Sequence, residues 1–132
     1  MTTITILDER QRIEIAAALF GRQFGLRIEP TIYNMAGMLS SQYRGGYWEM
    51  FALDNGGFFM HPRADTQFIV SAQNGYEGSL SPQAFGIVVC LYTYSHLSFS
   101  PELSDVCGEH YHLLREVALE NAEARGILAA ID

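Results

Sequence analysis

The residues best suited to chemistry lie close together near the C-terminus, in the run from Glu109 to Glu116. Residues three and four positions apart are neighbours on a helix, so Glu109, His112 and Glu116 share one face. His110 and His112 point about 200° apart and cannot bind one ion. The trio could form a cation site, or hold a perturbed histidine, in a small metal-dependent hydrolase. The alternative is an exposed polar face with His112 between carboxylates, and the loose spacing favours this alternative.

A second possible nucleophile site pairs Cys107 with His110, about one helical turn away. Cys107 faces the predicted core, however, and no glycine-rich loop beside it offers donors for an oxyanion. The chain also lacks a Gly-x-Ser-x-Gly elbow and a Gly-Lys-Ser/Thr phosphate loop. We therefore predict no catalytic residue, no metal and no cofactor. Cys90 and Cys107 are expected to be reduced thiols in the core.

Residues that could bind a macromolecule gather around a predicted β-hairpin. Tyr47 and Trp48 begin its first strand, and large aromatic side chains dominate binding hot spots. Adjacent strand residues point to opposite faces, so one of the two is exposed, and the sequence does not decide which. Asp54, Asn55 and Gly56 form the turn. All five residues are candidates for partner binding.

The charge distribution supplies a second candidate surface. The chain carries 15 acidic and 8 basic residues, a net charge of −7, and every basic residue is arginine. This balance disfavours direct DNA binding, because affinity for a duplex comes mainly from a clustered basic face. Seven of the acidic residues but only two arginines lie beyond position 100. Glu116, Glu120 and Glu123 are therefore a candidate acidic strip for a basic partner, although surface helices commonly carry such charge.

Two helices are predicted ahead of the hairpin. Asp8 and Gln11 form a capping box that begins the first helix, and Gly21 ends it. Its predicted inner face consists of Ile13, Ala16, Ala17 and Phe20. Pro30 suits the first turn of a second helix that ends at residues 45–46. The predicted inner face of that helix consists of Ile32, Met35, Leu39 and Tyr43.

Three further helices follow the hairpin. Ser81 and Pro82 begin one that is apolar nearly all round, which predicts a central buried helix. Another begins at Ser104 or Asp105, and Asn121 is expected to cap a short last helix. The predicted inner residues of the last two helices are Cys107, Tyr111, Leu114, Ala118, Ile127, Leu128 and Ile131.

The strands lie between the second and third helices. Residues 47–53 and 58–62 have a strand pattern around Asn55-Gly56, for which we predict a type I′ turn. This turn would pair Leu53 with Phe58, Ala52 with Phe59 and Phe51 with Met60. Residues 67–70 form a third strand. The expected class is α+β: a small three-stranded antiparallel meander packed with about four to five helices, in a single domain of residues 1–132.

The hydropathy pattern argues against a membrane-spanning segment and against a secretory signal. The chain has no stretch of about 18 uncharged apolar residues and no basic segment ahead of an apolar one at its start. We therefore expect a cytoplasmic protein. As a separate expectation, we predict a monomer or a weak dimer.

The block from Tyr43 to Met60 resembles the signature of the ArdB/KlcA family of antirestriction proteins. It contains Gly-Gly-Tyr-Trp, an aromatic strand, Asn-Gly-Gly-Phe and a methionine. Residues 80–88, with Ala-Phe-Gly-Ile-Val, and residues 111–115, Tyr-His-Leu-Leu-Arg, resemble two further motifs of the family. The closing Ala-Ile-Asp also fits. The resemblance covers nearly the whole chain apart from the N-terminal helix.

The resemblance implies a protein of plasmids, prophages or similar mobile elements that protects incoming DNA from type I restriction enzymes and leaves modification largely intact. No catalytic residues are assigned in the family. The expected partner is the restriction complex or a host protein acting with it. At −7 over 132 residues, the charge is too low to copy a duplex with one charge per about 1.7 Å. The alternative function is the hydrolase with Glu109, His112 and Glu116.

Overall fold

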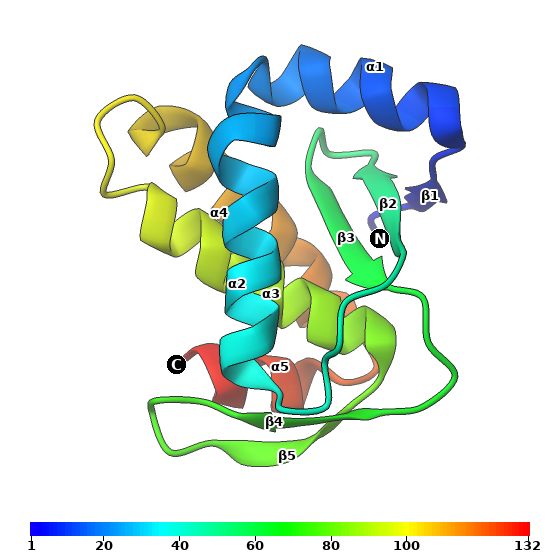
Figure 1. The fold of residues 1–132 in the computed structure, drawn as a ribbon, viewed down its shortest axis with the longest axis vertical. Helices are drawn as coiled ribbons and strands as arrows, with labels where there is room; N and C mark the ends of the chain where they lie inside the picture. The colour runs from blue at the N-terminus through cyan, green and yellow to red at the C-terminus, as the bar shows by residue number, and fades with distance from the viewer.

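The computed structural model describes all residues from Met1 to Asp132 and contains five α-helices, one π-helix and five strands. Figure 1 shows α3 crossing the middle of the molecule, with the other elements around it. In chain order the elements are β1 (Ile4–Ile6), α1 (Glu9–Phe20), the π-helix η1 (Phe24–Ile28), α2 (Glu29–Leu39), β2 (Trp48–Leu53), β3 (Phe58–Pro62), β4 (Phe68–Ser71), β5 (Glu77–Leu80), α3 (Pro82–Leu97), α4 (Ser104–Glu120) and α5 (Ala124–Ile131). The predicted α+β class with a three-stranded antiparallel sheet is confirmed.

The membership of that sheet differs from the prediction. Its order is β1-β2-β3, so its third strand comes from the N-terminus. The strand predicted at residues 67–70 exists as β4, but it pairs with β5 in a separate two-stranded sheet. β1 is only three residues long, too short for its alternation to be recognised without its partner. The sequence therefore identified the strands around the hairpin but not their pairing.

The register of the β2–β3 hairpin also differs from the prediction, by one residue. Ala52 pairs with Phe58, and Phe51 pairs with Phe59. The backbone N–H of Gly56 donates to the Leu53 carbonyl over 3.0 Å, and Gly56 alone in the turn has a positive φ, of 95°. A type I turn followed by a left-handed glycine therefore replaces the predicted type I′ turn.

Helix α3 is the centre of the core, as its apolar sequence predicted. Ser81 accepts a hydrogen bond from the Ala84 N–H, and eleven of the sixteen residues of α3 are buried. The Tyr94 hydroxyl donates to the Phe58 carbonyl over 2.7 Å, and the Cys90 thiol lies 3.5 Å from the Met60 carbonyl. These carbonyls belong to the outer edge of β3. α3 thus covers an edge that would otherwise be open to pairing with another chain.

The helix boundaries follow local signals in part. The capping box of Asp8 and Gln11 is formed as predicted, and Gly21 ends α1. The second helix is shorter than predicted, because Leu39 ends it, and η1 leads directly into it. Ile13 is 75% exposed, which corrects the predicted inner face of α1. No helix combines the length and hydropathy that crossing a membrane requires.

Candidate functional site

The tip of the β2–β3 hairpin lies against helix α4. The Asn55 side-chain amide donates to the Leu113 carbonyl over 3.0 Å and to the Glu116 carboxylate over 3.3 Å. The side-chain oxygen of Asn55 accepts a hydrogen bond of 2.9 Å from the Gly57 N–H, which fixes the turn. The structure therefore brings together two candidate regions that lie about sixty residues apart in the sequence.

The N-terminal segment extends this surface along α4. The Thr2 N–H donates to the Glu120 carboxylate over 2.8 Å, and the Asp54 N–H donates to the Thr3 carbonyl over 3.0 Å. Neither Asp54, Glu116 nor Glu120 forms a salt bridge, and all three are exposed. We call the surface formed by Asp54, Asn55, Gly56, Glu116 and Glu120 the acidic patch.

Glu123 does not lie on this exposed surface. Its carboxylate accepts hydrogen bonds from the backbone N–H of Ser81, over 3.0 Å, and from the Ser81 hydroxyl. The carboxylate therefore anchors the beginning of α3, where negative charge is favourable next to the helix dipole. This corrects the expectation of a continuous strip with Glu116 and Glu120.

The structure decides which of the two neighbouring aromatic residues is exposed. Trp48 is 2% exposed, and its indole N–H donates to the Tyr43 hydroxyl over 3.0 Å, so it is part of the core. Tyr47 is 43% exposed. The guanidinium of Arg12 lies 4.7 Å from the centre of its ring, and that of Arg63 lies 4.5 Å from it. Tyr47 is thus held by two cation–π contacts.

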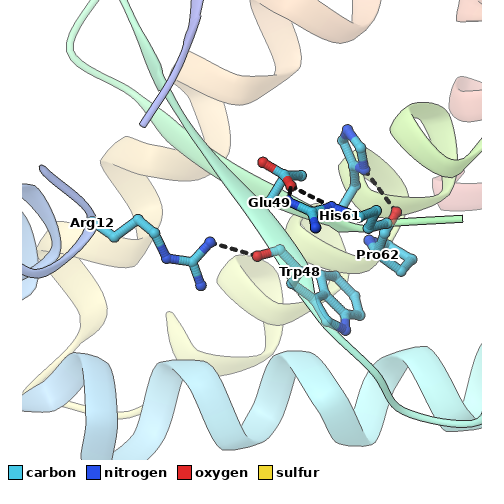
Figure 2. Close-up of polar contacts among 6 residues, drawn as sticks. Arg12, Trp48, Glu49, His61 and Pro62 are labelled. Atoms are coloured by element: carbon cyan, nitrogen blue, oxygen red, sulfur yellow. Dashed lines mark hydrogen bonds and ion pairs between the residues drawn. The ribbon is translucent and has the colours of Figure 1, made fainter. Parts of the chain in front are cut away.

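The two arginines are held by residues of β2, which begins directly after Tyr47. Figure 2 shows Arg12 reaching from α1 to the Trp48 carbonyl, a hydrogen bond of 2.6 Å. Arg63 forms an ion pair with Glu49 of β2. This group lies at the start of β2, whereas the acidic patch lies at its end. The structure therefore separates the predicted binding residues into two sites.

The predicted histidine face is open to solvent. Glu109, His112 and Glu116 are all exposed on α4. No group of three histidine, cysteine, aspartate or glutamate side chains lies close enough together to hold a metal ion. The geometry therefore does not form the metal site that the spacing left open.

The buried histidine is His110, whereas the sequence pattern predicted Tyr111 on the inner face of α4. Its ring is 4% exposed, lies 4.7 Å from the Phe20 ring, and leaves Nδ1 without a hydrogen-bond partner. Burial lowers the pKa of His110, and burial raises the pKa of Cys107 to about 11. A cysteine nucleophile needs the opposite shifts, a low thiol pKa and a basic imidazole. This pair is therefore part of the core.

Comparisons with known proteins agree with this arrangement. The family described as "Antirestriction protein" matches residues 41–132, which include β2 and everything after it. An antirestriction protein KlcA of Escherichia coli is 35% identical, with 97% of this chain and 92% of that protein covered. The chain belongs to the ArdB/KlcA family of antirestriction proteins.

Two further comparisons cover nearly the whole chain. An uncharacterised protein of Escherichia coli K12, YafX, is 37% identical over 98% of this chain and 88% of its own length. A solved structure has a TM-score of 0.91 and 32% identity, with 99% of this chain and 95% of that chain covered. That structure is described as showing that the KlcA and ArdB proteins have a novel fold and antirestriction activity against type I DNA restriction systems in vivo but not in vitro.

Proposed function

We propose that this protein relieves type I restriction of incoming mobile-element DNA, without blocking modification, by binding a protein rather than by catalysis. The observation that carries the proposal is the match to the KlcA/ArdB structure, at a TM-score of 0.91 over 99% of the chain. A fold alone does not define a function. Here, however, both the fold and the sequence identity point to the same family, which is described as antirestriction.

The relatives' activity in vivo but not in vitro supports a particular kind of partner. A protein that blocked the restriction enzyme by itself would act on the purified enzyme as well. The difference therefore favours a partner that is present only in the cell, either a host protein acting with the restriction complex or a cellular state of that complex. The activity belongs in the cytoplasm, where restriction enzymes meet incoming DNA.

The acidic patch is the surface that we propose for this partner. Its three unpaired carboxylates lie on α4 and the hairpin tip, and a protein surface with clustered arginines or lysines would complement them. Three charges are too few to imitate a duplex, which carries one charge per about 1.7 Å of axis. Recognition of a basic protein surface therefore fits better than DNA mimicry. Tyr47 is a second, separate contact candidate.

Plating of unmodified phage on a strain with an active type I system tests this function. The strain is compared with and without this gene, and the progeny phage are replated to learn whether their DNA became modified. We expect relief of restriction together with modified progeny. Absence of relief against several type I families, with the protein folded and abundant, would contradict the proposal.

A reconstituted cleavage reaction distinguishes a cellular partner from direct inhibition. Purified protein is added to a purified type I enzyme with DNA, and then to the same reaction supplemented with extract of cells that lack restriction genes. We expect inhibition only with the extract. Inhibition of the purified enzyme alone would show that the enzyme itself is the partner.

A further inference from the structure

A groove between α1 and the π-helix is the largest concave surface of the molecule, with a volume of about 680 Å³. That volume is within the range of clefts that bind ligands, roughly 300–1,000 Å³. Ile13 of α1 and Leu26 of η1 lie at the groove and are 75% and 65% exposed. Small residues leave the space between the two elements open: Ala16, Ala17, Gly21 and Gly25.

The exposed leucine lies in the irregular backbone of η1. The N–H of Glu29 donates to the Phe24 carbonyl five residues earlier, which defines the wide π turn. Within this turn Phe24 and Ile28 are buried, whereas Leu26 points outward. π turns have less favourable geometry than α turns and occur frequently at functional sites. The turn therefore holds an exposed apolar side chain at the groove.

The groove is also basic, on a protein whose net charge is −7. Arg12 and Arg22 lie along it, and neither has a carboxylate within salt-bridge distance. The one carboxylate that lines the groove, Glu29, accepts a hydrogen bond of 2.9 Å from the Tyr33 hydroxyl. Arg22 is therefore free for a ligand, and Arg12, whose Nη1 donates to the Trp48 carbonyl, still carries a charge that no carboxylate neutralises. Arg12 also contacts Tyr47, which joins the groove to the aromatic site.

We propose that this groove binds a segment of a partner protein that is apolar on one side and acidic along its flanks. The apolar side chains of the segment occupy the space between Ile13 and Leu26, as in the docking of an amphipathic helix in a groove. Its aspartate or glutamate side chains pair with Arg12 and Arg22, and a planar guanidinium is well suited to carboxylates. This site is distinct from the acidic patch, and the proposal does not rest on the antirestriction activity.

The test selects peptides from a phage-displayed random 16-residue library on the purified protein. We expect the enriched peptides to carry apolar residues at helical spacing together with aspartate or glutamate. The selected peptide is then synthesised with a fluorescent label, and its affinity is measured by anisotropy. A double Ile13→Ser, Leu26→Ser variant and an Arg22→Glu variant are each expected to bind at least about tenfold more weakly, the loss typical of hot-spot residues.

Matched controls use exposed residues outside the groove. Leu119→Ser on α4, where the leucine is 53% exposed, and Arg125→Glu on α5 should leave the affinity unchanged. A peptide with lysine in place of its acidic residues should lose binding to the original protein and regain it with Arg22→Glu. All variants change exposed side chains, and circular dichroism verifies their folding.

Several results would overturn the proposal. These are a failure to enrich any acidic apolar peptide, equal binding by the groove variants, and equal binding of the lysine peptide. Competition by duplex DNA would identify nucleic acid as the ligand instead. Sedimentation showing a dimer that Leu26→Ser dissociates would identify a second copy of the chain as the occupant. None of these experiments involves a restriction enzyme, so their failure is separate from failure of the proposed function.

Discussion

Replacement of Gly86 by alanine tests the packing that holds the hairpin in place. Gly86 lies in α3 where the helix passes over β3. A Cβ atom added there would lie 2.5 Å from the Met60 carbonyl oxygen and 2.7 Å from the His61 Cα. Both atoms belong to the backbone, so they cannot move aside as a flexible side chain could. The helix and the strand must separate to admit the methyl group.

The expected magnitude follows from two opposing effects. Overpacking of a tight core costs about 1–3 kcal/mol, and two rigid backbone contacts place Gly86→Ala near the upper limit. Alanine in place of glycine in a helix interior stabilises the folded protein by about 1 kcal/mol. We therefore expect a net loss of about 2 kcal/mol in the free energy of unfolding. In a domain of this size such a loss lowers the melting temperature by roughly 8 °C.

Gly108→Ala is the matched control, because Gly108 also lies inside a helix but a Cβ there would meet nothing within 4 Å. The helix effect then acts alone and stabilises the protein by up to about 1 kcal/mol. Urea unfolding followed by the fluorescence of Trp48, the single tryptophan, measures both variants. A Gly86→Ala protein as stable as Gly108→Ala would refute the close contact of α3 with β3.

Three further predictions concern stability. Because burial lowers the pKa of His110, the unfolded chain binds this proton more readily. Stability should therefore be full above the unfolded pKa of about 6.5 and fall as the pH drops below it, and His110→Phe should flatten this part of the pH profile measured by urea unfolding. Tyr94→Phe removes the hydroxyl that bonds the Phe58 carbonyl and should cost about 1 kcal/mol in the same assay, so an unchanged midpoint would contradict that bond. Asp8→Ala should cost about 1 kcal/mol through loss of the capping box, and Asp8→Asn should restore most of it.

Features set by local chemistry could be predicted from the sequence. The capping box at Asp8 and the N-cap at Ser81 depend on residues within one turn, and both are formed as predicted. The burial of α3 was equally clear, because a helix that is apolar nearly all round has no face suited to water. The strands at residues 48–53 and 58–62 were recognisable from aromatic content and turn residues.

Features set by contacts between distant segments could not be predicted. β4 pairs with β5 rather than β3, and nothing in residues 68–71 specifies the partner. The Asn55-Gly56 pair is compatible with two turn types, and a one-residue change of turn shifts the register of the whole hairpin. The π turn at Phe24–Ile28 has no sequence signature, and the sequence did not predict that it leads directly into α2.

The candidate site shows the same division. Charge and turn chemistry indicated Asp54 and Glu116 separately, but only the fold shows that Asn55 bonds to α4 and joins them. Strand alternation predicted that one of Tyr47 and Trp48 is buried, and the structure shows that the buried residue is Trp48. The burial of His110 was missed, because a polar residue on an amphipathic helix is normally assigned to the outer face.

The most direct test of the account is the efficiency of plating of unmodified phage in a type I restricting strain that carries charge-reversed protein. The variant combines Asp54→Lys, Glu116→Lys and Glu120→Lys, and the control combines Asp65→Lys with Glu77→Lys, two exposed acidic residues far from α4 in sequence. We expect the original chain and the control to relieve restriction and the triple variant to lose relief while remaining folded and equally abundant. Full relief by the triple variant would show that the acidic patch does not bind the partner, and no relief by the original chain would contradict the proposed function itself.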